Sequence, residues 1–570
     1  MPIGDLIRAN AAHPPVAPRP FLYFDAVRIT HAEYFVEAVR WANLFRRQRA
    51  NATPFHVGIL LDNIPDYFFA LGGAALAGAT VVGINNTKRG VHLARDIAYT
   101  DCQILVTEEK YLALLAPVLE QSGLEPQRVL VTHRWDAVPD APRTPGFPDL
   151  YSQLAERAAE PDPRVPVSDA DIFVLVFTSG TVTAPKAVLC SHGRLVETGK
   201  NIGANIYDIR ADDVGYVAMP LFHANALMCG FMPALYYGVG VSMIRKFSRS
   251  RWLSDIRRYG ATFFNYTGKP LAYVLSTPAQ PDDHVNPLRI CYGNEGSHRV
   301  VAEFEARFGC RVIDVFGASE GGLGVTRQPG DPPTSIGFPA LGIMVVDEHG
   351  VERPPARFDP SGRLNNADEA IGEIVNTEGL GWFEGYYKNP EAMQQRTRNG
   401  WYWTGDLGYK DERGYLYFAG RDGEWLRVDG ENFVARPVEE ILQRHADVVL
   451  AAVYGVPDAD GGDRVMAALV LRDGTEFDPT DFGTFLRLQA DLSPKWAPTY
   501  VRIASELPQT ASAKVLKGEL RRQKFRPDLC GERVYWRERG EEPYRLFTLD
   551  DYERARARFV AVGREAQLEI

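Results

Sequence analysis

The chain has 570 residues, of which 45% are hydrophobic and 24% are charged, as is typical of a globular protein. One hydrophobic core organises roughly 250–300 residues, so this length predicts two or more domains. The net charge of −10 argues against nucleic acid as the main partner, and the six scattered cysteines argue against a zinc site or a disulfide framework.

Two long runs without Asp, Glu, Lys or Arg occur in the first half of the chain, at 67–84 and 214–244. Each reaches the length of a membrane span, but the first is rich in Gly and Ala and the second contains two prolines. We therefore expect both to be buried core. The first run predicts a helix from Asp66 to Ala77, a turn at Gly78 and a strand from Thr80 to Ile84.

Apolar, strand-like runs alternate with helical stretches such as 31–49 over the first 320 residues. The runs are HVGILL (56–61), QILVTEE (103–109), RVLVTH (128–133), IFVLVFTSG (172–180) and RVIDVFG (311–317). This alternation predicts an α/β fold with largely parallel sheets. From about residue 370, short strands with Gly turns predict a β-rich subdomain, and the chain beyond Arg421 predicts a smaller α+β domain.

The segment FTSGTVTAPK (177–186) follows a predicted strand and has the chemistry of a phosphate-binding loop. Its hydroxyls, glycine and cation belong to Thr178, Ser179, Gly180, Thr181, Thr183 and Lys186. It lacks the second glycine and the Lys-Ser/Thr pair of a Walker loop, so it does not belong to a P-loop nucleotidase. Taken alone, it is equally consistent with a polar turn.

The segment DVFGASEGG (314–322) has two interpretations. Gly317 to Gly321 fits Gly-x-Ser-x-Gly, the nucleophile elbow of α/β-hydrolases, although His349 and His445 do not lie in a telling sequence context. Alternatively, Glu320 is a magnesium ligand and Ser319 a hydroxyl that contacts phosphate.

Three later segments carry single charged residues close to turns. Asp406 in WYWTGDLG could accept hydrogen bonds from a ribose, and Arg421 in GRDGEWLRVDGENF could bind ribose or phosphate. Gly423 tolerates a large backbone rotation, and Lys514 ends the small-residue loop QTASAK. Each of these residues alone has an ordinary surface interpretation.

In this order and spacing, the five segments resemble the signature motifs of the acyl-adenylate-forming superfamily, which comprises acyl-CoA synthetases, adenylation domains and luciferases. The resemblance covers most of the chain, to about Arg521. Within the superfamily the chain is most similar to fatty-acyl and very-long-chain acyl-CoA ligases of the fatty-acid-transport type, and to bacterial fatty-acid and sterol-side-chain CoA ligases. The segment GNEGS (293–297) ahead of FGASE is shared with that branch.

This resemblance implies an N-terminal AMP- and acyl-binding domain at 1–422 and a mobile C-terminal domain at 423–570. It implies that ATP, with Mg²⁺, converts a carboxylic acid to acyl-AMP and pyrophosphate, and that CoA then displaces AMP. The expected substrate is a medium to very long fatty acid or a sterol side-chain acid. A cytoplasmic location is expected, and peripheral membrane contact and a homodimer are left open.

The resemblance also implies roles for individual residues. Lys514, Glu320 and Ser319 would be catalytic, with Lys514 bridging the carboxylate and the α-phosphate and Glu320 binding magnesium. Nucleotide and CoA binding is expected from Thr178, Ser179, Gly180, Thr181, Thr183, Lys186, Asp314, Phe316, Gly317, Ser319, Asp406, Arg421, Gly430, Glu431 and Asn432. The acyl pocket is expected to include His223, Ala224, Asn225, Tyr266 and Gly293. Gly423 would be the hinge.

The chain departs from the usual motifs at four positions, where Val182, Thr183, Ser319 and Ala513 replace other residues. Every charged catalytic candidate remains, which favours an active enzyme. The alternatives are an acyl-AMP ligase with another acceptor, a serine hydrolase and a degenerate lipid-binding protein. The motifs do not distinguish chain length, fatty from sterol acids, or the oligomeric state.

Overall fold

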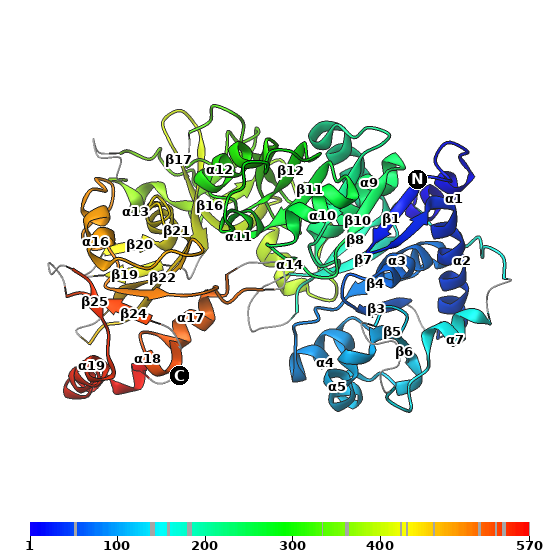
Figure 1. Cartoon of the computed structure of the whole chain (residues 1–570), viewed down its shortest axis with the longest axis horizontal. Helices are drawn as coiled ribbons and strands as arrows, with labels where there is room; N and C mark the ends of the chain where they lie inside the picture. Colours follow the sequence, from blue (N-terminus) through cyan, green and yellow to red (C-terminus); the bar gives the residue numbers. More distant parts are fainter. Residues whose placement is uncertain are drawn as a thin grey trace.

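The computed structural model describes residues 1–50, 54–136, 143–156, 160–178, 185–332, 334–358, 364–421, 425–428, 431–459, 462–510, 515–530, 533–538 and 543–568. Two α/β sheets make up the N-terminal part of the chain, and a small β-sheet and a C-terminal domain follow them (Figure 1). The first two strands of the chain join the second of the two α/β sheets. The mixed α/β architecture with a β-rich part and a smaller α+β domain is confirmed. Residues 422–424 are not described, so the domain boundary at 422/423 stays a prediction.

The first sheet has six strands, which are parallel except at one edge. In spatial order they are β6 (Val129–Thr132), β5 (Cys102–Glu108), β3 (His56–Leu60), β4 (Thr80–Gly83), β7 (Ile172–Phe177) and the antiparallel β8 (Ala187–Ser191). The helices of this region are α3 (Pro65–Ala77), α4 (Gly90–Tyr99), α5 (Leu112–Leu115), α6 (Leu119–Ser122) and α7 (Leu150–Ala155). The expected strands are therefore present, within a few residues of the predicted ends.

The second sheet has eight strands, and turns at the carboxyl ends of some of them contain candidate site residues. In spatial order they are β14 (Gly324–Thr326), β13 (Arg311–Gly317), β12 (Ile290–Asn294), β11 (Phe263–Thr267), β9 (Val214–Val217), β10 (Gly240–Met243), β1 (Pro20–Phe24) and β2 (Val27–Thr30). Strands β13 to β1 run parallel, whereas β14 and β2 are antiparallel edges. The helices are α1 (Ile3–Ala12), α2 (His31–Gln48), α8 (His192–Ile202), α9 (Met232–Tyr237), α10 (Trp252–Tyr259), α11 (Pro270–Leu275) and α12 (His298–Phe308).

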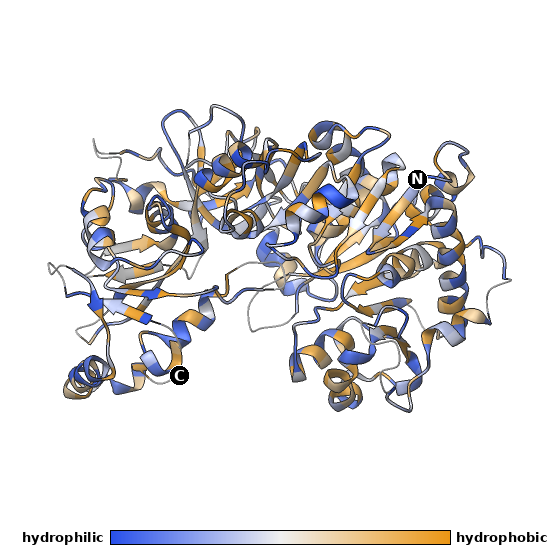
Figure 2. Ribbon diagram, viewed as in Figure 1, coloured by the Kyte–Doolittle hydropathy of each residue, from blue (hydrophilic) through white to orange (hydrophobic). Residues whose placement is uncertain are grey.

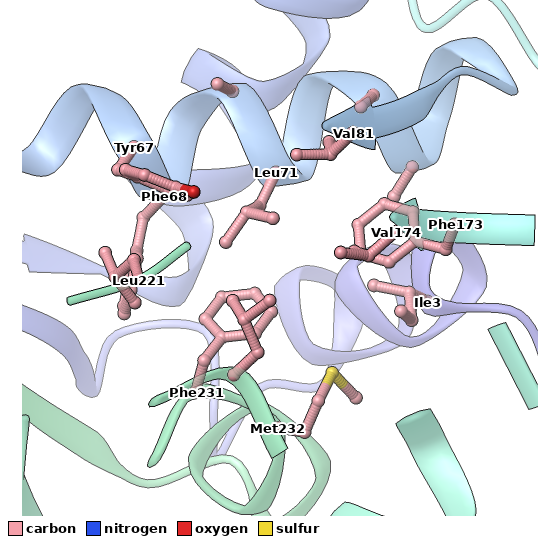
Figure 3. Packing of buried hydrophobic residues seen from close by; sticks show 14 of the residues in the cluster. Ile3, Tyr67, Phe68, Leu71, Val81, Phe173, Val174, Leu221, Phe231 and Met232 are labelled. Atoms are coloured by element: carbon pink, nitrogen blue, oxygen red, sulfur yellow. The ribbon is translucent and has the colours of Figure 1, made fainter. Parts of the chain in front are cut away.

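Helix α3 is buried along its whole length, as the sequence predicts. It ends at Gly78 in a left-handed conformation with φ +66°, and β4 follows. A Cβ added at Gly73 would lie 2.5 Å from the Cβ of Trp41 in α2, so this glycine lets the two helices touch. Within the core, the Phe68 and Phe231 rings pack edge to face, with 4.8 Å between their centroids (Figure 3). No helix in the described ranges is long and apolar enough to cross a membrane.

The β-rich part is a four-stranded antiparallel sheet that begins earlier than the expected residue 370. Its strands are β15 (Ile343–Val346), β16 (Gly372–Asn376), β17 (Tyr402–Lys410) and β18 (Leu416–Arg421), and its helices are α13 (Ala367–Ala370) and α14 (Pro390–Arg396). The earlier β15 was missed because four residues are too few to show a clear alternating pattern, although Gly342 precedes it and a turn from Asp347 to Gly350 follows it.

The C-terminal domain contains a hairpin and a five-stranded sheet. The strands are β19 (Trp425–Val428) and β20 (Glu431–Val434), then β21 (Val448–Pro457), β22 (Asp463–Leu471), β23 (Tyr500–Ile503), β24 (Arg533–Trp536) and β25 (Arg545–Leu546). The helices are α15 (Ala435–Leu442), α16 (Pro479–Arg487), α17 (Lys517–Gln523), α18 (Pro527–Cys530) and α19 (Leu549–Ala561). Alternate residues of β21 enter two different cores, Ala452 one and Val453 the other, so both faces of the sheet are covered. In Figure 2, where hydrophobic residues are orange, the strands in the interior of the molecule are largely orange.

Candidate active site

The candidate site is a cavity of about 580 Å³ between the second sheet, the β-rich sheet and the C-terminal domain. It lies beyond the carboxyl ends of β12 and β13, where open α/β sheets usually bind ligands. Its N-terminal lining includes Lys269, Asn294, Asp314, Phe316, Asp406 and Phe418, and its C-terminal lining includes Arg436, Glu439, Thr510, Val515, Lys517 and Arg521. Seven Lys or Arg residues and five acidic residues line it, a surplus of positive charge that favours an anionic ligand.

Asp314 is one of the acidic residues that line this cavity. Its Oδ2 accepts hydrogen bonds from the Tyr266 hydroxyl and from the Gly296 backbone N–H, both at 2.7 Å. Burial raises the pKa of Asp314 to about 6, although both donors favour the ionised form. Phe316, two residues further along β13, lies 5.5 Å from the Phe418 ring. The expected adenine-binding pair, Asp314 and Phe316, therefore shares one wall of the cavity, together with Gly317.

Asp406 is buried in β17 and also lines the cavity. Its backbone N–H donates to Thr404 Oγ1 at 3.0 Å. In the sheet register it lies opposite Arg421 of β18. The antiparallel pairing of β17 and β18 thus places the two residues expected at the ribose side by side, although the side chain of Arg421 is not described.

Glu320 lies in the turn after β13 with 6% of its surface exposed. The Tyr386 hydroxyl donates to Glu320 Oε1 at 2.7 Å, and Lys186 Nζ lies 5.9 Å from the centroid of the Tyr386 ring. Burial lowers the pKa of Lys186, the nearby Arg396 guanidinium lowers it further, and Glu320 raises it. The structure therefore brings Lys186 of the first sheet next to Glu320 of the second.

The surroundings of Ser319 contradict the hydrolase interpretation. Strand β13 is followed by a turn and the antiparallel strand β14, whereas a nucleophile elbow joins a strand to a helix. The Ser319 carbonyl accepts a hydrogen bond of 2.6 Å from Arg194 Nη2. His349 is an exposed turn residue, and His445 pairs with Asp481 in the C-terminal domain.

Three of the residues expected in the acyl pocket, Asn225, Tyr266 and Gly293, meet at the ends of β11 and β12. His223, Ala224 and Asn225 precede a π-helical turn, Ala226–Phe231, and Asn225 Nδ2 donates to the Tyr266 carbonyl at 3.2 Å. A Cβ at Gly293 would lie 2.1 Å from that same carbonyl, so only glycine fits there. Because the Tyr266 hydroxyl contacts Asp314, this residue joins the expected acyl wall to the expected nucleotide wall. Its acyl-binding role stays a prediction.

Several expected site residues lie outside the described residues: Ser179, Gly180, Thr181, Thr183, Gly423, Gly430 and Lys514. For Glu431 and Asn432 the strand is described but the side chains are not. The structure does describe the residues on either side of two of these gaps. The Thr178 N–H donates to the Lys186 carbonyl at 3.0 Å, and Thr510 and Val515, on either side of 511–514, both line the cavity.

Sequence reasoning missed several residues around Glu320 and the cavity. Tyr386 and Arg396 lie in YYKNPEAMQQR, whose pattern predicts no site, and they reach Glu320 only through the fold. Lys269 and Arg436 line the cavity from different domains. A lysine inside the apolar segment FFNYTGKP is the single sequence signal that could have indicated Lys269.

The residues present fit the binding of Mg²⁺ with a nucleotide. Mg²⁺ is usually held by one or two carboxylates together with substrate phosphates and waters. Glu320 supplies one buried carboxylate beside the cation Lys186. In the described ranges, one group of three residues is arranged as potential metal ligands. It consists of His445, Asp447 and Asp481 and lies in the C-terminal domain.

Comparisons with known proteins identify the family of this chain. The family "AMP-binding enzyme" matches residues 7–387, and "AMP-binding enzyme C-terminal domain" matches residues 437–514. Steroid-22-oyl-CoA synthetase of Rhodococcus jostii (strain RHA1) is 46% identical over 520 residues, covering 91% of this chain and 90% of the relative. Medium/long-chain-fatty-acid–CoA ligase FadD17 of Mycobacterium marinum (strain ATCC BAA-535 / M) is 42% identical and covers 88% and 92%.

Among solved structures, the anthranilate CoA ligase AuaEII in complex with anthranoyl-AMP superposes with a TM-score of 0.77. The match covers 91% of this chain and 96% of that one at 21% identity. A benzoate CoA ligase from Burkholderia xenovorans LB400 has a TM-score of 0.75 at 20% identity and covers 91% and 100%. At this level of identity the two structures show that the fold is shared.

Proposed function

This chain belongs to the AMP-binding enzyme family and is an acid–thiol ligase that uses ATP and CoA, and we propose that its acid is a hydrophobic one. The proposed substrates are medium to very long fatty acids or the side-chain acid of a sterol. The names of the two relatives above, a steroid-22-oyl-CoA synthetase and a medium/long-chain-fatty-acid CoA ligase, support this choice.

In the first half-reaction, a carboxylate oxygen attacks the α-phosphorus of ATP, and the bond from that phosphorus to pyrophosphate breaks. Two anions must meet, so the protein contributes mainly positioning and positive charge. We assign Asp314 and Phe316 to adenine, and Asp406 and Arg421 to the ribose. Glu320 would hold Mg²⁺, which neutralises phosphate charge.

The phosphates are assigned to the loop that ends at Lys186. Thr178, Ser179, Gly180, Thr181 and Thr183 would donate hydrogen bonds to the β- and γ-phosphates, and Ser319 would contact the α-phosphate. Lys514 would bridge the attacking carboxylate and the α-phosphate. The positions of Thr510 and Val515 in the cavity wall support this assignment.

In the second half-reaction, the CoA sulfur attacks the acyl carbonyl carbon, and the bond to AMP breaks. We propose that the C-terminal domain rotates about Gly423 between the two steps. Gly430, Glu431 and Asn432 would then approach the thiol, and His223, Ala224, Asn225, Tyr266 and Gly293 would contact the acyl group.

One observation carries this proposal: the cavity between the domains collects Asp314, Phe316 and Asp406 from one domain and Thr510 and Val515 from the other. These residues come from motifs spread over about two hundred positions, yet they line one cavity. A binding surface without chemistry would not require the segments that flank Lys514 to face the nucleotide residues.

The test measures AMP and pyrophosphate release from ATP with a panel of acids, each with and without CoA. The panel contains a C22 steroid acid, a medium-chain and a long-chain fatty acid, and acetate as a hydrophilic control. We expect the hydrophobic acids to give acyl-CoA and acetate to give none. AMP release with no acid preference overturns the substrate proposal, and acyl-AMP that accumulates despite CoA favours another acceptor.

A further inference from the structure

Arg396 is the last residue of α14 and belongs to no motif with an expected role. Its Nη1 donates to the Trp403 carbonyl at 3.0 Å, which ties the side chain to the β-rich sheet. The guanidinium also interacts with the Tyr386 hydroxyl and with the Glu320 carboxylate. It therefore lies in the group of residues around Glu320, although α14 is distant in sequence from both phosphate motifs.

The fold makes space for this side chain at one glycine. Gly405, in the WTGD turn, has φ +71°, and a Cβ there would lie 2.5 Å from Arg396 Nη1. The Gly405 N–H donates to Glu373 Oε1 at 2.7 Å, which fixes the turn in place. The guanidinium thus occupies a position that a side chain at residue 405 would block.

Among the described residues, Lys186 and Arg396 bring two cations close together beside Glu320. Lys186 and Arg396 are both cations, and Arg396 is close enough to Lys186 to disfavour its ammonium form. Glu320 acts on both cations, and Glu373, which holds the Gly405 turn, also acts on Arg396. Two like charges held together in a partly buried site are costly, and an anion with several negative charges relieves that cost.

We propose that Arg396, beside Lys186, binds the β- and γ-phosphates of ATP and stabilises the pyrophosphate as it leaves. The inference rests on the proposed function and adds a residue to its phosphate site. When the bond from the α-phosphorus breaks, negative charge grows on the pyrophosphate oxygens. A guanidinium presents parallel N–H donors that match two phosphate oxygens, and its charge does not titrate in the working pH range.

The test compares Arg396→Gln and Arg396→Lys with Arg398→Gln as the matched control. Arg398 lies two residues away but stacks on the Trp403 ring at 3.6 Å and pairs with Glu373 at 3.1 Å. Isothermal titration calorimetry measures the affinity for MgATP, for Mg-pyrophosphate and for AMP, with no acid or CoA present. Circular dichroism and thermal melting confirm that each variant is folded.

We expect Arg396→Gln to weaken MgATP and pyrophosphate binding by about 10- to 100-fold, the range for a charged hydrogen-bonding partner. AMP lacks the β- and γ-phosphates, so its affinity should change by less than about twofold. Arg396→Lys should recover part of the loss, and Arg398→Gln should leave all three affinities unchanged. Thioester formation from supplied acyl-AMP should also be unaffected by Arg396→Gln.

Equal losses for ATP and AMP would assign Arg396 a structural role as partner of Glu320 and would overturn the proposal. Unchanged pyrophosphate binding in Arg396→Gln would overturn it as well. A wild-type protein that binds MgATP but makes no acyl-CoA from any acid would refute the proposed function alone. In that case the selective loss of pyrophosphate binding would still support the phosphate role of Arg396.

Discussion

At the scale of single residues, the site depends on a few buried or half-buried polar groups whose partners come from distant parts of the chain. Asp314 is held by Tyr266 and Gly296, and Glu320 by Tyr386. Such groups are costly to bury unless every partner is present, so they fix both the geometry and the charge of the site. Their titration and removal give the most direct tests of the assigned roles.

The pKa of Asp314 predicts a pH dependence for adenine recognition. Its carboxylate is ionised above about pH 6, and below that pH protonation removes the negative charge and weakens its oxygens as acceptors for the adenine amine. We expect the affinity for adenosine, a probe without phosphates, to fall by up to about tenfold per pH unit below pH 6. Calorimetry between pH 4.5 and 8 measures it.

Two variants serve as controls for this titration. Asp314→Asn keeps an oxygen acceptor but does not titrate, so its profile should be flat. Tyr266→Phe removes a donor that favours the ionised form, so it should move the midpoint of the profile to higher pH. The groups around Asp314 are Tyr266, Arg327 and Arg436, and the pKa of His298 in the same wall is lowered by burial. A wild-type midpoint that Asp314→Asn leaves in place would refute the assignment.

Lys514 is predicted to act in the first half-reaction alone. Lys514→Ala should slow acyl-AMP formation by at least about 100-fold, the usual loss when one group that stabilises developing charge is removed. Thioester formation from supplied acyl-AMP should remain within a few-fold of wild type. Single-turnover measurements of the two steps check this, with exposed Arg522→Ala as the control. Equal losses in both steps would contradict the assigned role.

At the scale of elements, close contacts decide where the helices and strands lie relative to each other. Helix α3 has no polar face and is read from the sequence as buried core. The face of α3 that contains Gly73 packs against Trp41 of α2. The π-helical turn Ala226–Phe231 packs on β9 and β11, and the sequence pattern does not indicate it.

Replacing glycine by alanine should have opposite effects on stability in two helices, α3 and α17. Gly73→Ala places a methyl 2.5 Å from Trp41 and should destabilise the protein by about 1–3 kcal/mol, as overpacking does. Gly518→Ala lies in α17 with no atom within 4 Å, so the better helix propensity of Ala should stabilise it by up to about 1 kcal/mol. Thermal melting of both variants checks the prediction, which a lower melting temperature for Gly518→Ala than for Gly73→Ala would contradict.

At the scale of the whole molecule, the two domains are joined by contacts between α12 and the C-terminal domain. Arg299 Nη1 donates to the His445 carbonyl at 2.6 Å, and Glu303 pairs with Arg472 at 2.9 Å. Both pairs hold the arrangement in which Thr510 and Val515 line the cavity. If the C-terminal domain rotates between the half-reactions, these contacts belong to one of the two arrangements.

Breaking the ion pair should therefore change the two half-reactions unequally. A partly exposed ion pair is worth about 0.2–1 kcal/mol, so Glu303→Gln should slow acyl-AMP formation by up to about fivefold. Transfer from supplied acyl-AMP to CoA should be unchanged or faster. Glu565→Gln, which removes a pair with Arg556 inside the C-terminal domain, is the control. Stopped-flow rates that fall equally in both steps would rule out this conformational role.

The sequence by itself determined the main strands of the first sheet, strand β13, the buried helix α3 and the order of the five motifs, because these follow from local periodicity and turn chemistry. The tertiary structure alone decided that Tyr386 and Arg396 meet Glu320, that Tyr266 holds Asp314 and that β18 places Arg421 opposite Asp406. Such contacts join residues tens to hundreds of positions apart. Strand order, close approach at glycines and the packing of domains set them, and no local pattern in the sequence encodes these.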